Sequence, residues 1–249
     1  MDGFLKLVLL FGVGSIAGVL NVMAGGGSTI TLPVLIFLGL EPTLANGTNR
    51  LGIIAQTLSA VVSFRQEKYH DFKLSLKLTA FTLPGAVAGA IIATRISNEL
   101  FQKILAYVLI CVTASLLLRK ANKNKASEQQ GKPSWWIYPV MLGIGFYGGF
   151  MQVGVGFLFM ASLFYLMKLD LIRVNMHKVF IIFVYTIPAF LIFVFTGKVE
   201  WKYGLILALG MGLGGWWAAK ISVKKGEKFI RIVLIAAILL MALKLLGLF

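Results

Sequence analysis

The chain has 249 residues, of which 59% are hydrophobic and only 13% are charged. A soluble domain is about half apolar and a quarter charged, so this composition excludes an ordinary soluble protein and predicts an all-α polytopic membrane protein. The net charge of +15 indicates basic cytoplasmic loops rather than a nucleic-acid partner, because no basic-aromatic patch accompanies it.

Two apolar segments fill residues 4–40, and they join at Gly25, Gly26 and Gly27. Each of these glycines costs a helix about 1 kcal/mol relative to alanine, so the helix is expected to break there. The unit is either two crossings or one re-entrant hairpin, and the sequence leaves both open. Broken backbone inside a membrane needs cover from protein or a water-filled cavity, which points to a transport site.

Three further spans are expected at residues 45–64, 74–94 and 101–118. The polar stretch 119–134 carries five basic residues against Glu128 alone, and it predicts a cytoplasmic linker. This linker divides a first transmembrane repeat at 1–118 from a second at 135–249. Trp135 and Trp136 are expected to anchor the chain at the membrane interface. Cys111 lies within a span and is expected to be a small core residue.

The second half repeats the motifs of the first half in the same order, at offsets between 125 and 131 residues. The matched glycines are Gly12, Gly14 and Gly18 with Gly143, Gly145 and Gly149, and Gly85 and Gly89 with Gly210 and Gly214. A second break is expected from Gln152 to Gly156. Each repeat is therefore expected to contain a broken or hairpin helical unit plus three transmembrane helices, with 8–10 membrane segments in total.

The two repeats are expected to be inverted, because a hairpin followed by three crossings leaves the second half upside down. With the linker in the cytoplasm, 17 of the 24 basic residues fall on the cytoplasmic side, and Lys178 is among them. The seven outside are Lys6, Arg50, Arg95, Lys103, Lys198, Lys202 and Lys244. This bias agrees with inverted repeats and places both termini outside the cytoplasm.

All nine acidic residues fall in loops or at the ends of the expected spans. Cation pumps and many proton-coupled carriers use carboxylates inside the membrane, so the sequence argues against a metal-cation transporter and a carboxylate proton relay. A sodium site made by the backbone stays open. No metal, cofactor, catalytic triad or nucleotide motif is expected, and the chain is not expected to be an enzyme.

The residues near the two breaks are neutral-polar or basic. The candidate substrate-binding residues are Asn21, Gly25, Gly26, Gly27, Ser28, Asn46, Asn49, Arg50, Gln56, Gln152, Gly156, Asn175, His177 and Lys178. Half-helix N-termini present free N–H groups and positive dipole ends, which favour a small anion with several acceptor oxygens. Arg50 would bind such an anion bidentately, and Lys178 would act as a point charge.

Each candidate also has a structural alternative. Arg50 and Lys178 lie near span starts and would then extend to the lipid headgroups. The glycines would only pack helices, and Asn21 and Gln152 would hydrogen-bond between helices. His177 is expected to be a hydrogen-bonded structural residue rather than a proton-responsive group. Packing glycines serve a monomer and a homodimer alike, so a homodimer is left open.

The stretch from Gly12 to Ser28, with Pro33 and the motif Ala45-Asn46-Gly47-Thr48-Asn49-Arg50, resembles the sulfite exporter TauE/SafE family, also called the toluene sulfonate uptake permease family. The similarity extends to about Phe229. The resemblance implies a bacterial or archaeal inner-membrane transporter of small sulfur-containing anions such as sulfite or organosulfonates. The second half departs from the pattern, because its glycines are interrupted and no proline corresponds to Pro33.

The sequence therefore predicts an exporter or permease in which two repeats rock around a central anion site. Its expected partners are a small sulfur anion and the lipid bilayer. Two alternatives stay open at this point: an anion channel with the same basic, glycine-lined centre, and a membrane assembly partner that transports nothing.

Overall fold

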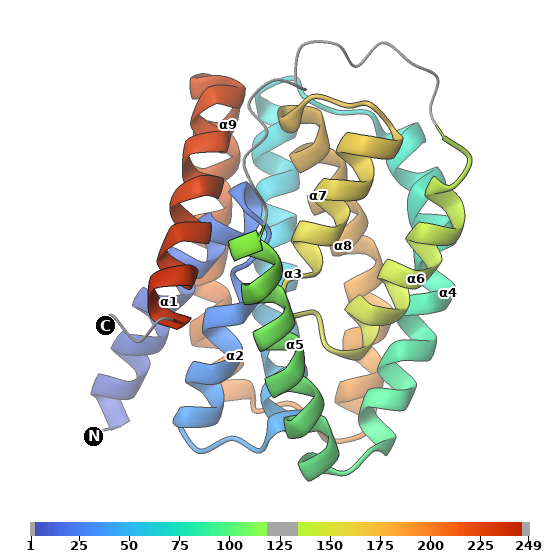
Figure 1. Ribbon diagram of the computed structural model, residues 1–249. Helices are drawn as coiled ribbons and strands as arrows, with labels where there is room; N and C mark the ends of the chain where they lie inside the picture. Colours follow the sequence, from blue (N-terminus) through green and yellow to red (C-terminus); the bar gives the residue numbers. More distant parts are fainter. Residues whose placement is uncertain (1–2, 119–133, 246–249) are drawn as a thin grey trace.

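The structure is a computed structural model that describes residues 3–118 and 134–245 (Figure 1). These residues form an all-helical bundle without β-strands. Its helices are α1 (Gly3–Met23), α2 (Ser28–Phe37), α3 (Pro42–Gln66), α4 (Phe72–Arg95), α5 (Asn98–Leu118), α6 (Ile137–Phe150), α7 (Val155–Leu166), α8 (Leu171–Phe195) and α9 (Trp201–Leu245). The all-α fold is confirmed, and the segments predicted at 45–64, 74–94 and 101–118 lie within the helices α3, α4 and α5.

Four of the described helices are long and apolar enough to cross a membrane: α1, α4, α8 and the part of α9 up to Gly226. Helix α3 has 25 residues, as α8 does, but its sequence from Asn46 to Arg50 is polar. At Gly226 the backbone of α9 leaves the helical conformation, with φ 73° and ψ −174°. Each half thus contributes a broken hairpin and then three helical segments. The predicted linker at 119–134 lies outside the described residues, except Ser134.

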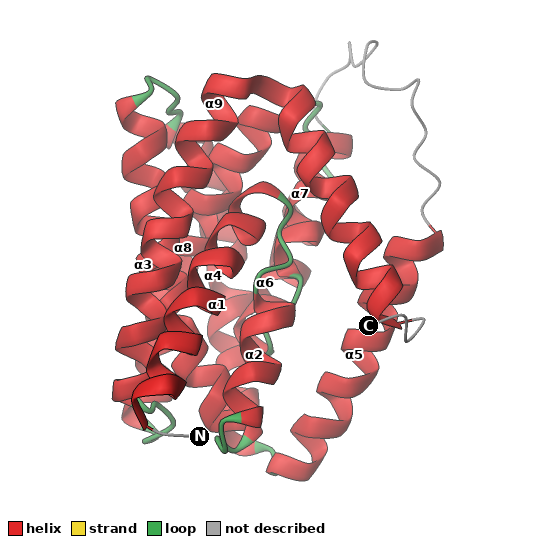
Figure 2. Ribbon diagram, turned by 90° about the vertical axis from the view of Figure 1, so that its left-hand side faces the viewer, coloured by secondary structure: helices red, strands yellow, loops and turns green. Residues whose placement is uncertain are grey.

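The helices break inside the bundle at the two positions that the sequence predicts. Helix α1 ends at Met23 before α2 begins at Ser28, and α6 ends at Phe150 before α7 begins at Val155. Figure 2 shows loop segments midway between the two ends of the bundle. With 10 residues, α2 is about 15 Å long, roughly half of the ~30 Å hydrocarbon core. Of the two readings, this length favours a re-entrant hairpin.

Glycine pairs join each hairpin to a helix of the opposite half. A Cβ on Gly14 would lie 3.1 Å from the carbonyl oxygen of Leu207, so α1 and α9 pack backbone to backbone. In the same way, a Cβ on Gly145 of α6 would overlap the carbonyl oxygen of Thr82 on α4. Small residues four apart allow this close approach between membrane helices. The matched glycine pairs are therefore used for packing within the chain.

The described loops gather at two ends of the bundle. The α3–α4 and α7–α8 loops and the Gly226 bend lie at one end, while the α2–α3, α4–α5 and α8–α9 loops lie at the other (Figure 1). The first end carries the described basic loop residues assigned above to the cytoplasm. Trp135 and Trp136 are exposed, as an interfacial anchor would be. The expectation for Cys111 is wrong: its side chain is exposed, because it lies on the outer face of α5.

We expect Gly145→Ala to destabilise the protein, because the new methyl group would force α6 away from the carbonyl of Thr82. Overpacking of this kind costs about 1–3 kcal/mol, which thermal unfolding in detergent would detect as a lower Tm. The matched control is Gly143→Ala on the same helix, where a Cβ meets nothing within 4 Å. Equal unfolding temperatures for the two variants would contradict the proposed α4–α6 contact.

Candidate functional site

The two helix breaks meet backbone to backbone at Gly25 and Gly156. A Cβ on Gly25 would overlap the carbonyl carbon of Gly156, and a Cβ on Gly156 would overlap the Cα of Gly25. Gly25 also has a φ of +89°, a conformation that residues with a Cβ rarely adopt. Both positions therefore need glycine. Gly26 and Gly27 are buried beside them, and Gly27 immediately precedes the first residue of α2.

Arg50 of α3 is fully buried and binds the end of α6, in the opposite half. Its Nη1 donates to Oε1 of Gln152 at 3.0 Å, and its Nη2 donates to the carbonyls of Gly148 at 3.3 Å and Gly149. The guanidinium carbon lies 4.7 Å from the centre of the Phe193 ring. Carbonyls in the last turn of a helix have no partner within the helix, so Arg50 satisfies groups that the break leaves free.

Lys178 of α8 makes the corresponding contact with the end of α1. Its Nζ donates to the carbonyls of Asn21 at 3.2 Å and Val22 at 2.6 Å, and to Oδ1 of Asn175 at 2.8 Å. Three acceptors match the three N–H donors of an ammonium group. Each half therefore supplies one buried cation to the broken helix of the other half.

These positions correct two sequence-based assignments. The count of basic residues on each side of the membrane assigned Arg50 to the outside and Lys178 to the cytoplasm. The structural alternative extended both side chains to the lipid headgroups. Both side chains have 0% exposure, so neither is a loop residue nor reaches the surface. The reason is that both lie in the third turn of a long helix and point to its packed side.

The predicted amides form a network around the two cations. Nδ2 of Asn21 donates to Oε1 of Gln56 at 2.9 Å, and Nε2 of Gln152 donates to Oγ1 of Thr186 at 3.1 Å. Nδ2 of Asn46 donates to the carbonyl of Phe150 at 2.8 Å, at the end of α6.

Asn49 connects the first break to α3. Its Oδ1 accepts from Oγ1 of Thr31 at 2.7 Å, and its Nδ2 donates to Oγ of Ser28 at 3.4 Å. The structure thus brings all the predicted polar residues except His177 to the two breaks.

The charge at the breaks is positive overall. The C-terminus of a helix carries about −0.5 of an elementary charge, so α1 and α6 each offset about half of one cation. No side chain caps the N-terminus of α2 or α7, and these ends add positive charge. Among the described residues, the ion pair joins Arg173 to Asp170 at the start of α8, and it involves neither Arg50 nor Lys178. The site therefore favours a bound anion.

Several buried polar atoms at the breaks lack a hydrogen-bond partner among the described residues. Three of them can donate: Nε of Arg50, Nδ2 of Asn175 and the hydroxyl of Tyr185. The fourth, Oδ1 of Asn46, accepts. The orientation of Asn175 is fixed, because a lysine ammonium can only donate to its Oδ1. An unsatisfied buried donor costs about 1–3 kcal/mol, so the three donors are the atoms most suited to bind an acceptor-rich ligand.

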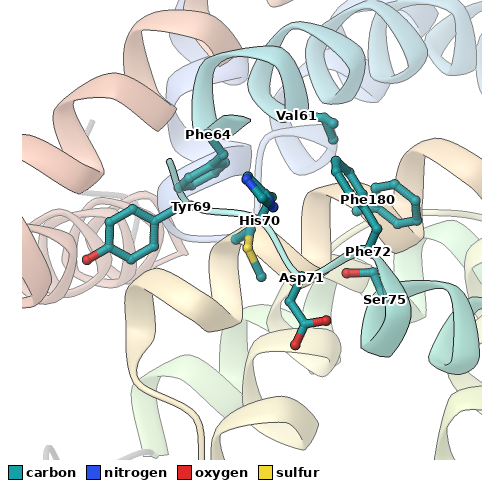
Figure 3. Close-up of a pocket in the computed structure, with 9 residues that line it drawn as sticks. Val61, Phe64, Tyr69, His70, Asp71, Phe72, Ser75 and Phe180 are labelled. Carbon is teal, nitrogen blue, oxygen red and sulfur yellow. The ribbon is translucent and has the colours of Figure 1, made fainter. Parts of the chain in front are cut away.

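A vestibule of about 650 Å³ lies at the end that carries the basic loops. It is lined by the α3–α4 loop, the α7–α8 loop and the start of α8, and Lys68, His70 and Arg173 are among its residues. A smaller hollow of about 10 Å³, room for about one water, adjoins it among Phe64, Phe72 and Phe180 (Figure 3).

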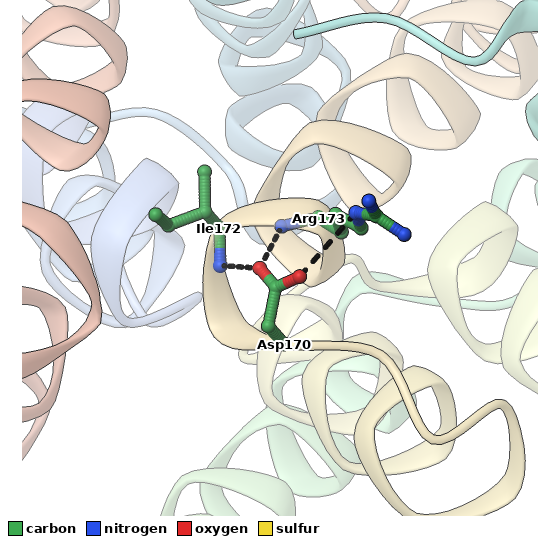
Figure 4. A network of polar contacts seen from close by, with 3 residues as sticks. All are labelled: Asp170, Ile172 and Arg173. Carbon is green, nitrogen blue, oxygen red and sulfur yellow. Dashed lines mark hydrogen bonds and ion pairs between the residues drawn. The ribbon is translucent and has the colours of Figure 1, made fainter.

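The two carboxylates of the vestibule accept hydrogen bonds from backbone N–H groups in the first turn of a helix. Asp71 accepts from the backbone N–H of Leu74 at 3.1 Å. Asp170 accepts from the N–H groups of Ile172 at 3.0 Å and Arg173 at 2.9 Å, and pairs with Nε of Arg173 at 3.4 Å (Figure 4). Both carboxylates thus bind backbone N–H groups at helix N-termini, where a negative charge is favoured.

His177 lies at the vestibule rather than at the breaks. Its Nδ1 is 2.8 Å from Oγ of Ser75, and its side chain is 1% exposed. This contact agrees with the expectation of a hydrogen-bonded residue. Lys178 follows His177 directly on α8, so one residue of the vestibule wall is the sequence neighbour of a cation at the breaks.

Comparison with known proteins identifies the family. Residues 10–245 match the family described as sulfite exporter TauE/SafE. The chain belongs to the TauE/SafE family. The chain is similar to the "Probable membrane transporter protein ORF9" of Sinorhizobium sp, which is 30% identical over 98% of this chain and 94% of that protein.

Two further relatives are also described as probable membrane transporter proteins. The "Probable membrane transporter protein YfcA" of Escherichia coli is 28% identical over 97% of this chain and 90% of its own length. The "Probable membrane transporter protein YunE" of Bacillus subtilis is 28% identical over 93% of this chain and 95% of its own length. No solved structure matches the chain. The protein is therefore a multi-pass membrane transporter of the TauE/SafE family, not an enzyme.

The sequence analysis missed Tyr185 and Thr186. The offset of 129 residues that relates Asn46 to Asn175 also relates Gln56 and Thr57 to this pair. Applied throughout α8, that offset would have matched Tyr185 and Thr186 to polar residues of the first half. The apolar sequence around Tyr185 gave no other signal.

We expect Gly25→Ala to abolish transport and to lower the free energy of unfolding by more than about 2 kcal/mol, since strain at a positive φ alone costs about 1–2 kcal/mol and the methyl group overlaps Gly156 as well. Thermal unfolding in detergent and flux in proteoliposomes would measure the two effects. Gly39→Ala is the control, because its φ is +100° but its Cβ meets nothing within 4 Å. Equal losses in both variants would show that the contact between the breaks is unimportant.

Proposed function

We propose that the protein is an exporter or permease of small sulfur-containing oxyanions, such as sulfite or an organosulfonate, and that the anion binds where the two breaks meet. One observation carries this proposal. Arg50 and Lys178 are both fully buried at the breaks, and their described contacts are carbonyls, amides and an aromatic ring rather than carboxylates.

The physical argument begins with the cost of these charges. An ionised side chain in the membrane interior is expensive and is usually paired or functional. Helix ends offset only about half of each charge, which leaves room for one anion between the two cations. Sulfite and sulfonates present several acceptor oxygens, as the free donors of Arg50, Asn175 and Tyr185 require. The name of the family agrees with this substrate class.

The membrane potential supports export of such an anion. A cytoplasm-negative potential drives one negative charge outward with about 2.3 kcal/mol per 100 mV, so no carboxylate-based coupling is needed. The vestibule at the basic end would then admit the anion from the cytoplasm. We propose that the protein lies in a bacterial or archaeal inner membrane, with both termini outside the cytoplasm and the basic loops inside.

Alternating access would use the contacts that cross between the two halves. In this mechanism the halves form an inverted repeat and rock around the anion. Each cation holds the broken helix of the other half through its terminal carbonyls. An anion that binds Arg50 or Lys178 competes with those carbonyls, and it would thereby loosen the contact between the halves.

We expect Arg50→Ala to lower flux at least tenfold, because a hydrogen bond to a charged group contributes about 1.5–3 kcal/mol. Purified protein in liposomes would be loaded separately with sulfite, sulfoacetate, taurine and sulfate. Asn21→Ala should have a smaller effect, because its amide is neutral. Arg50→Lys keeps the charge and should retain part of the flux.

Lys202→Ala, on the exposed face of α9, is the control and should transport like the wild type. Unfolding temperatures separate lost transport from lost folding. Saturable exchange would support a carrier, whereas unitary currents would indicate a channel. If the wild type moves none of the four sulfur compounds under either sign of potential, the sulfur-anion proposal fails. Flux that survives Arg50→Ala and Asn21→Ala would mean that the site lies elsewhere.

A further inference from the structure

The hydroxyl of Tyr185 is held at the second break by three helices. Tyr185 lies on α8 with 0% exposure, and its ring stacks on Phe159 of α7 with 6.0 Å between centroids. A Cβ on Gly148 of α6 would lie 2.5 Å from the hydroxyl oxygen, so that oxygen faces the last turn of α6. The ring therefore has little freedom to move its hydroxyl elsewhere.

Arg50 reaches the same turn of α6. Its Nη2 donates to the carbonyls of Gly148 and Gly149, and it interacts electrostatically with Tyr185. Nε of Arg50 and the hydroxyl of Tyr185 are both buried without a hydrogen-bond partner among the described residues. Thr186, the other polar neighbour, interacts with the Tyr185 hydroxyl, but its Oγ1 accepts from Gln152 and the two hydroxyls do not reach hydrogen-bond geometry.

A second tyrosine near this break makes a useful contrast. The hydroxyl of Tyr147 on α6 donates to the carbonyl of Val153, within the break itself. Tyr147 therefore has a structural partner. Buried hydroxyls are nearly always hydrogen-bonded, so the unpaired one of Tyr185 indicates a group that the described residues do not supply.

We infer that Tyr185 is a substrate-binding residue that determines specificity: its hydroxyl and Nε of Arg50 donate to different oxygens of one bound oxyanion. This inference rests on the proposed function and names a residue of that site. Two donors on separate side chains fit an anion whose charge is spread over several oxygens. A sulfite or sulfonate group meets this requirement, whereas a halide offers a single acceptor atom.

The test compares Tyr185→Phe with Tyr147→Phe in proteoliposomes, with sulfite, taurine and sulfoacetate as probes. Tyr185→Phe keeps the ring that stacks on Phe159 and removes only the free hydroxyl. We expect it to raise the KM for the transported anion about tenfold, with an unfolding temperature close to that of the wild type. Tyr147→Phe should instead lower the unfolding temperature and change the KM less.

Arg50→Lys and the double variant complete a mutant cycle. If both donors bind one anion, the effects of Arg50→Lys and Tyr185→Phe on KM will not be additive. An unchanged KM in Tyr185→Phe, with a wild type that transports, would overturn the inference and leave the proposed function standing. A lower unfolding temperature with an unchanged KM would do the same and indicate a buried water. If the wild type moves none of the probes, the proposed function fails and the inference fails with it.

Discussion

The structure depends on one constraint: backbone groups that are freed inside a membrane must find partners there. Breaking α1 and α6 leaves their last carbonyls without bonds within the helix. Lys178 satisfies the first set and Arg50 the second, each from the opposite half. These hydrogen bonds therefore join the two halves at the helix breaks. These contacts also hold two positively charged side chains inside the bundle rather than in solvated loops.

The structural role and the proposed binding role therefore fall on the same atoms. From the sequence, Arg50 either binds substrate or extends to the lipid headgroups. In the structure it has a third role, because it caps the C-terminus of the broken helix α6. A cap does not exclude a ligand, because the helix end offsets only about half of the charge. The free Nε shows that the guanidinium is not saturated by these contacts. The glycine contact between Gly25 and Gly156 holds the two breaks against each other.

The correspondence between the halves holds for backbone and packing rather than for the chemistry of the site. Glycine pairs join α1 to α9 and α6 to α4 in matching ways. Asn46 and Asn175 match in sequence, yet the first leaves an oxygen free and the second leaves an NH2 group free. The position that matches Lys178 is Asn49, so the first half carries its cation one residue later. The two breaks therefore offer different donors, a guanidinium with a tyrosine hydroxyl and an ammonium with an amide.

The sequence by itself determined the membrane class, the helical spans, both breaks and the polar residues that surround them, because hydropathy and glycine runs are local signals. It also placed Asn21 and Gln152 at the breaks through their matching positions. Only the tertiary structure decided that Arg50 and Lys178 are buried, since burial depends on which face of a helix meets another half of the chain. Only the structure shows that His177 lines the vestibule, that Cys111 is exposed and that the hydroxyl of Tyr185 is buried without a hydrogen-bond partner among the described residues. Partners 98 to 157 residues apart cannot be read from local sequence.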